Sequence, residues 1–157
     1  MTTTLLYIGK TDSKYLETSV LDYIKRIGKY LPINAQIIPD LKNRKNLSIP
    51  EQKQLEGKLL LEFFNPSDIV VLLDENGTQY TSVKFAEQLN KYKLSGKKHL
   101  VFVIGGPYGF SDEVYSRANG KISLSRMTFS HQMVRLIFIE QLYRACTILR
   151  NEPYHHV

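Results

Sequence analysis

The sequence contains only one cysteine, Cys146, in its 157 residues. It cannot form an internal disulfide, and it lies in an apolar segment without metal-ligand spacing, so we interpret it as a core residue and not as a nucleophile. No apolar run approaches the ~20 residues that span a bilayer, and Met1–Thr4 lacks the basic region of a signal peptide. These absences predict a cytoplasmic protein without a membrane segment.

Phosphate-binding fingerprints are also absent. No G-x-x-x-x-G-K-[ST] pattern occurs, and the glycines after residue 104 follow a G-G-x-x-G spacing that lacks the first G-x-G step of the dinucleotide motif. Enzymes with a P-loop or a dinucleotide fingerprint are therefore disfavoured. No repeat, low-complexity segment or linker divides the chain, so we expect a single domain over residues 1–157, which buries roughly 70% of its unfolded surface.

The charge balance is moderately basic, with 21 Lys and Arg against 15 Asp and Glu and a net charge of +6. This excess is compatible with a polyanionic partner but does not prove one. Residues 40–48 concentrate Lys42, Arg44 and Lys45 without an apolar period. They are either a solvated loop or a basic arm for RNA phosphates.

Buried apolar runs alternate with amphipathic segments along the chain. This alternation predicts an α/β fold with a mostly parallel sheet and helices on both faces. Glu75–Gly77 has the composition of a turn, and Leu55, Leu59, Leu60 and Phe63 should form the buried face of one helix. The expected strands cover 4–9, 35–38, 68–74, 100–104 and 122–125, and the expected helices cover 14–30, 50–64, 131–149 and the segments beginning at Ser82 and Ser111.

The segment 100–131 carries the strongest signal for a binding site. Its buried strand stops at Gly105-Gly106-Pro107, where glycines let backbone approach a ligand and proline stiffens the turn. The run 122–125 leads into a second loop, Arg126–Ser130. Loops at the strand ends of α/β sheets bind small molecules, although a Gly-Gly-Pro sequence is also compatible with a simple tight turn.

The last helix is apolar around most of its circumference, which predicts that it is covered on two sides. We expect a homodimer with this helix at the interface; the alternative is an entirely internal helix. Arg135 lies in this run, where an unpaired guanidinium would be costly. We therefore expect it to pair within the dimer or to face an anionic ligand, on the same helix face as His131.

The C-terminal tail contains Tyr154, His155 and His156. These side chains could stack on a base and hydrogen-bond phosphate or ribose. No acidic or cysteine ligands are spaced around the two histidines, so we predict no metal.

Four motifs in order make the chain resemble the RlmH family of SPOUT-class methyltransferases. The resemblance covers the whole chain and includes Tyr7–Lys10. One departure is Ser130, where family members commonly have proline. The motifs are Phe102–Pro107, Leu124–Arg135, Glu140–Ala145 and Pro153–His155.

The resemblance implies methylation of N3 of a pseudouridine in large-subunit (23S) ribosomal RNA, with the assembled ribosome as substrate. It also implies a homodimer, a SPOUT-like α/β fold with a C-terminal trefoil knot, and S-adenosylmethionine held in that knot. The implied cofactor contacts are Leu73, Gly105, Leu124, Ser125, Arg126, Met127, Thr128 and Phe129.

We further hypothesise that His131, Arg135, Tyr154 and His155 line the side of the target nucleotide. Arg135 would stabilise phosphate or the developing N3 anion, Tyr154 would stack or hydrogen-bond, and His131 or His155 would take the N3 proton. A buried structural role is the alternative for each histidine. For the whole chain, the alternatives are a non-catalytic RNA-binding protein and a nucleotide-using enzyme.

Overall fold

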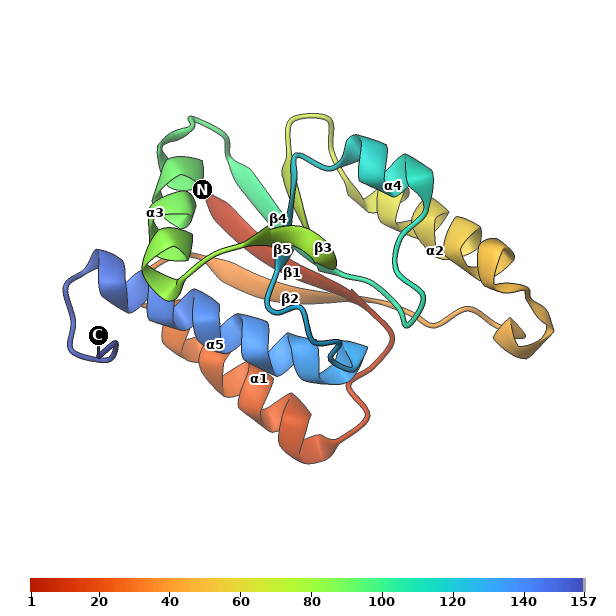
Figure 1. Ribbon diagram of the computed structural model, residues 1–157, viewed down its shortest axis with the longest axis horizontal. Helices are drawn as coiled ribbons and strands as arrows, with labels where there is room; N and C mark the ends of the chain where they lie inside the picture. The colour runs from red at the N-terminus through yellow and green to blue at the C-terminus, as the bar shows by residue number, and fades with distance from the viewer. Residues whose placement is uncertain (157) are drawn as a thin grey trace.

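Five parallel strands form the centre of the computed structural model, which describes residues 1–156 (Figure 1). The strand order is β2-β1-β4-β3-β5, so β4 lies in the middle. The apolar run 100–104 is buried in β4, as expected for a central parallel strand. The strands are β1 (Thr2–Ile8), β2 (Ile33–Ile38), β3 (Ile69–Gln79), β4 (His99–Ile104) and β5 (Gly120–Ser123).

Helices cover both faces of the sheet, which confirms the α/β prediction (Figure 1). One face packs against α1 (Lys14–Ile27), α3 (Ser82–Leu94) and α5 (His131–Leu149); the other packs against α2 (Ile49–Phe63) and α4 (Asp112–Arg117). A short 3-10 helix, Arg44–Asn46, precedes α2. The trefoil knot remains a prediction. No helix in residues 1–156 has both the length and the apolar character needed to cross a membrane.

The larger core lies beneath α1, α3 and α5. At its centre the rings of Phe102 and Phe138 are 4.8 Å apart, and Phe85 contacts both. Cys146 is buried in the same cluster, and burial raises the pKa of its thiol to about 11. The interpretation of this cysteine as a core residue is confirmed.

Every α-helix begins at a serine or threonine whose side-chain oxygen accepts a backbone N–H of the first turn. Each cap satisfies a donor that has no partner inside its helix. Ser130 caps α5 in this way, by accepting from Met133 N at 3.1 Å. The departure from proline at this position therefore gives α5 a hydrogen-bonded start. The other caps are Ser13, Ser48, Thr81 and Ser111.

Several predicted details are wrong. Glu75–Gly77 is not a turn but part of β3, whose pairing with β5 shifts register between Leu73 and Thr78. Gly77 allows this irregularity because a Cβ there would lie 2.7 Å from the β5 backbone. The first helix ends at Ile27 and not at residue 30, and β5 covers 120–123, earlier than the predicted 122–125.

The buried face of α2 also differs from the prediction. Leu60 is buried as expected, but Leu55 is exposed, and Gln52, Glu56 and Gly57 take the buried positions. The cause is close contact with α4, since a Cβ on Gly57 would lie 2.3 Å from Ser111 Oγ. A glycine at this contact lets α2 approach closely enough to bury its polar neighbours.

Candidate active site

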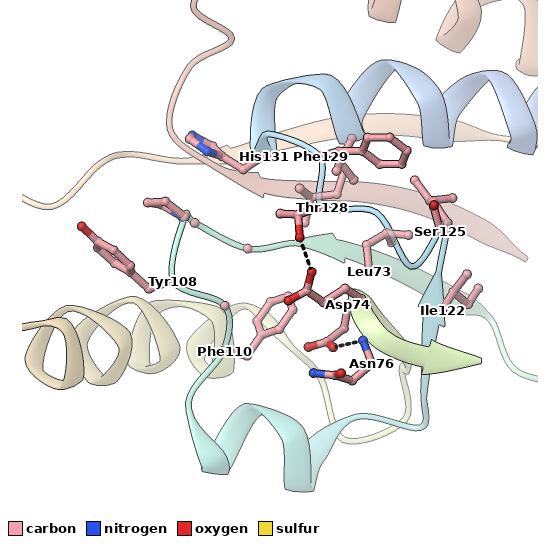
Figure 2. Close-up of a pocket in the computed structure, with 18 of the residues that line it drawn as sticks. Leu73, Asp74, Asn76, Tyr108, Phe110, Ile122, Ser125, Thr128, Phe129 and His131 are labelled. Atoms are coloured by element: carbon pink, nitrogen blue, oxygen red, sulfur yellow. Dashed lines mark hydrogen bonds between the residues drawn. The ribbon is translucent and has the colours of Figure 1, made fainter. Parts of the chain in front are cut away.

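The carboxyl ends of the five parallel strands meet at one edge of the sheet. A cavity of about 350 Å³ lies there over the ends of β3, β4 and β5, and we call it the β3–β5 cavity (Figure 2). Seven of the eight predicted cofactor residues line it. They are Leu73, Gly105, Leu124, Ser125, Met127, Thr128 and Phe129. The eighth, Arg126, is exposed and does not line the cavity.

The β3–β5 cavity is apolar toward the sheet and polar along the irregular part of β3. Thr128 Oγ1 donates to Glu75 Oε2 at 2.8 Å, which joins the loop after β5 to β3. Asp74 accepts from the Asn76 backbone N–H at 2.8 Å and from the hydroxyl of Tyr115. Burial, together with this second bond, raises the pKa of Tyr115. The polar side is therefore a set of oriented carboxylates and hydroxyls.

The loop after β4 packs too tightly for side chains at its two glycines. A Cβ on Gly105 would lie 2.9 Å from the ring of Phe110, and a Cβ on Gly106 would lie 2.8 Å from Glu56 Oε1. Glu56 is only 4% exposed and its Oε1 has no hydrogen-bond partner, although Gln52 Nε2 donates to Oε2 at 3.3 Å. Burial raises the pKa of this carboxyl.

His131 begins α5 and lines the end of the cavity near Tyr108 (Figure 2). Burial lowers the pKa of the imidazole, and the neighbouring positive charge of Arg135 lowers it further. The ring is therefore neutral at pH 7, which is the protonation state that a proton acceptor needs.

Arg135 is 0% exposed and does not line the β3–β5 cavity. Its guanidinium donates to the carbonyl of Ile8 at 2.7 Å, to that of Gly9 at 3.0 Å and to Thr11 Oγ1 at 3.1 Å. It also lies 4.1 Å from the centroid of the Tyr7 ring. These contacts connect the start of α5 to the end of β1, a use of this residue that the sequence did not predict.

Tyr154 and His155 lie at the other end of α5. Tyr154 donates to Glu140 Oε1 at 2.9 Å, and Arg144 contacts His155 Nδ1 at 3.2 Å. Glu140 and Arg144 are nine and thirteen residues beyond His131, so they lie about 14 and 20 Å along the helix from its start at the helical rise per residue. Within one chain, the structure therefore does not bring the four predicted target-side residues together.

Comparison with known proteins matches almost the whole chain. The family described as "Predicted SPOUT methyltransferase" matches residues 1–155. The protein named ribosomal RNA large subunit methyltransferase H from Flavobacterium psychrophilum is 61% identical over 152 residues, covering 97% of each chain. The chain belongs to the RlmH family of SPOUT methyltransferases.

Other relatives with the same name are also similar to this chain over almost its whole length. The proteins of the same name from Christiangramia forsetii and Bacteroides thetaiotaomicron are 60% and 52% identical over 156 residues, covering 99% of each chain. A solved structure described as a probable methylase family protein from Haemophilus influenzae Rd KW20 superposes with a TM-score of 0.54 at 12% identity. It covers 99% of this chain and 70% of that one, and at this identity it supports the fold alone.

Sequence reasoning missed several residues of this RlmH-family cavity. Asp74, Glu75 and Asn76 lie in the irregular second part of β3, and Tyr108 and Phe110 lie in the loop after β4. For these residues, a position at or after the end of a predicted strand was the available signal. The contact of Tyr115 with Asp74 joins residues 41 apart and had no local signal. Within residues 1–156, no three His, Cys, Asp or Glu side chains gather as a metal site would require. The missed lining residues include Asp74, Glu75, Asn76, Tyr108, Phe110 and Tyr115.

Proposed function

We propose that this chain is an S-adenosylmethionine-dependent methyltransferase that acts in the cytoplasm on N3 of a pseudouridine in 23S ribosomal RNA, within the assembled ribosome. The observation that carries the proposal is the β3–β5 cavity, built from strand-end loops in a chain 61% identical to a ribosomal RNA large subunit methyltransferase. The names of the relatives support methylation of ribosomal RNA, and the choice of N3 of a pseudouridine rests on the family resemblance.

The lining of the β3–β5 cavity suits an adenosine-containing cofactor. Its volume of about 350 Å³ lies within the usual range for small-molecule sites. Leu73, Leu124 and Phe129 supply apolar surface for the faces of an adenine, while the backbone around Gly105 and Thr128 supplies amides and carbonyls for its edge. S-adenosylmethionine supplies a methyl group already activated by the positive charge on its sulfur, so the proposed reaction requires no metal.

The tasks left to the chain are to orient the nucleotide and to remove the N3 proton. The N3 electron pair forms the new bond to the methyl carbon, the pair of the broken carbon–sulfur bond stays on sulfur, and the proton moves to a base. We assign that base to His131, because its lowered pKa leaves a neutral imidazole at the cavity. Arg135 has a positioning role in this proposal, since its bonds hold the first turn of α5.

We also propose that the enzyme is a homodimer, with the loop before α5 forming the trefoil knot. Three apolar side chains near the start of α5 are exposed: Met127 by 75%, Met133 by 44% and Phe129 by 36%. A twofold axis that packs two copies of α5 antiparallel covers this surface. It also brings Tyr154 and His155 of the partner subunit toward the start of α5, where they can contact the target nucleotide.

The test is transfer of labelled methyl groups to ribosomes that lack the modification, followed by mapping of the modified base. We expect one methyl group per ribosome, at N3 of a pseudouridine. Calorimetry with S-adenosylmethionine separates this function from non-catalytic RNA binding, which also predicts salt-sensitive association with RNA but needs no cofactor cavity. Binding of ribosomes without binding of the cofactor would favour the non-catalytic alternative.

A further inference from the structure

A second cavity, of about 340 Å³, lies at the same edge of the sheet as the β3–β5 cavity. It covers the carboxyl ends of β1 and β2, on the opposite side of central β4, and we call it the β1–β2 cavity. The two cavities share four lining residues, Gly106, Pro107, Tyr108 and His131. The loop after β4 and the first residue of α5 therefore form a common wall between them.

Most side chains that line the β1–β2 cavity are polar, and three of them are cations. Lys10 follows β1, and Arg44 and Lys45 belong to the basic segment 40–48, for which the sequence is compatible with a solvated loop or an RNA-binding arm. Arg44 pairs with Asp40 at 2.9 Å on the surface. Within residues 1–156, neither lysine has a carboxylate at ion-pair distance, so both ammonium groups can receive an anion at modest cost.

Two carboxylates, Asp12 and Asp40, and two amide side chains contribute further polarity. Gln132 Oε1 accepts from the Asp12 backbone N–H at 2.9 Å, and its Nε2 donates to the Lys10 carbonyl at 3.2 Å. These bonds fix the loop that carries Lys10 against the first turn of α5. Gln52 lines the cavity from α2 and also donates to buried Glu56. The wall behind the cations is thus held in place by hydrogen bonds.

We infer that the β1–β2 cavity receives the target nucleotide of the RNA, with Lys10, Arg44 and Lys45 contacting its flanking phosphates and the base lying against the Gly106–Tyr108 wall. This inference rests on the proposed function and deepens it. A base modified on its ring must leave the stack of its neighbours to enter an enzyme site, and a cavity bordered by cations suits such an extruded nucleotide.

The common wall is the feature that favours a nucleotide over another anion. Methyl transfer requires the donor carbon and the acceptor nitrogen to approach within about 3–3.5 Å. A cofactor in the β3–β5 cavity and a nucleotide in the β1–β2 cavity can approach this closely only at the wall that the two cavities share. Gly106 and His131 line both cavities, so the glycine backbone borders both ligands and the imidazole can accept the proton of the acceptor nitrogen.

The test compares Lys10→Ala and the double variant Arg44→Ala/Lys45→Ala with the wild-type enzyme on ribosomes that lack the modification. We expect KM for the ribosome to rise at least tenfold in the double variant, with kcat changed less than twofold. The dependence of log KM on log salt should become shallower by about one unit for each phosphate contact removed. The affinity for S-adenosylmethionine should stay unchanged, because these residues do not line the β3–β5 cavity.

The matched control is Lys97→Ala/Lys98→Ala, which removes the same charge. These exposed residues precede β4 and lie at the amino ends of the strands, opposite both cavities. Equal effects in the two double variants would overturn the inference in favour of a general surface-charge effect. A wild-type KM and salt slope in the Arg44→Ala/Lys45→Ala variant would also overturn the inference. The variant Arg44→Lys/Lys45→Ala should retain part of the affinity for the ribosome because it keeps one cation.

Failure of the inference is distinguishable from failure of the proposed function. If the wild-type enzyme neither binds S-adenosylmethionine nor methylates ribosomes, the proposed function is wrong. If it does both and the variants at Lys10, Arg44 and Lys45 behave as wild type, only the placement of the nucleotide is wrong. Thermal unfolding of each variant shows that the comparison is between folded proteins, and these exposed positions should leave it unchanged.

Discussion

The carboxylate of Glu56 lies directly behind Gly106, so that a methyl group at position 106 would come within 2.8 Å of Glu56 Oε1. Gly106→Ala must therefore displace a buried side chain or the wall between the two cavities. We expect the free energy of unfolding to fall by about 1–3 kcal/mol, the usual cost of overpacking. We also expect methyl transfer to fall at least tenfold, because displacement of the wall misplaces donor and acceptor.

The control for Gly106→Ala is Gly120→Ala, where the added Cβ meets its nearest neighbour at an ordinary 3.7 Å. Urea denaturation and single-turnover methylation measure both variants. A Gly106→Ala enzyme as stable and active as the Gly120→Ala enzyme would contradict the close contact with Glu56.

Glu56→Gln should stabilise the protein at neutral pH. Burial raises the pKa of Glu56 in the folded state, so the unfolded chain loses its proton at lower pH than the folded one. The wild-type protein therefore loses stability as the pH rises from the unfolded pKa through the folded pKa, and the glutamine variant does not. The stability difference, measured by urea denaturation between pH 4 and pH 8, should grow with pH. A constant difference would show that Glu56 does not titrate in this range.

Arg135→Ala should destabilise the fold strongly. The change removes three hydrogen bonds from a charged donor and the contact with the Tyr7 ring, and it leaves buried carbonyls of Ile8 and Gly9 without these partners. We expect a loss of about 3 kcal/mol or more. Exposed Arg126→Ala should change the stability by less than about 0.5 kcal/mol. Similar midpoints for the two variants in urea denaturation would be inconsistent with the described role of Arg135.

His131→Ala should lower single-turnover methylation by roughly 10²- to 10⁴-fold, the usual contribution of a general base. In the wild-type enzyme the rate should rise with pH through a pKa below that of an ordinary histidine and then stay level, because the neutral imidazole is the active form. Ribosome and cofactor affinities serve as controls for folding. A variant that retains the wild-type rate and pH profile would exclude His131 as the base.

Met133→Glu tests the homodimer, because this half-exposed residue lies on the apolar surface near the start of α5. A carboxylate in a packed apolar interface is costly, so the variant should be monomeric by light scattering where the wild type is dimeric. Exposed Tyr15→Glu on α1 is the control and should leave the mass unchanged. If the wild-type protein is a monomer, the homodimer proposal is wrong, and Tyr154 and His155 cannot reach the site of a second subunit.

Local sequence signals predicted much of the fold and of the β3–β5 cavity. The boundaries of α5 were predicted at both ends from its apolar run, and the structure adds that Ser130 caps the start. The position of the two loops that line this cavity could be predicted because Gly105 and the segment after β5 both follow buried strands, whereas the cofactor contacts came from the family resemblance. Glu75–Gly77 was misjudged because asparagine and glycine mark irregular strands as well as turns.

Other parts of the site depend on contacts that no local pattern contains. The bonds of Arg135 to Ile8 and Gly9 span more than 120 residues. The polar buried face of α2 depends on the fit of Gly57 against Ser111, the residue that caps α4. The division of the sheet edge into two cavities depends on β4 lying between β1 and β3, an order fixed only by the tertiary structure.

The burial of Cys146 has a practical consequence for following the enzyme on its substrate. It is the chain's single thiol, and a pKa of about 11 leaves it almost entirely protonated and slow to react at neutral pH. A cysteine introduced on the exposed side of α1 would then be the one position that a maleimide dye modifies. Fluorescent labelling of the enzyme therefore needs no cysteine-free background.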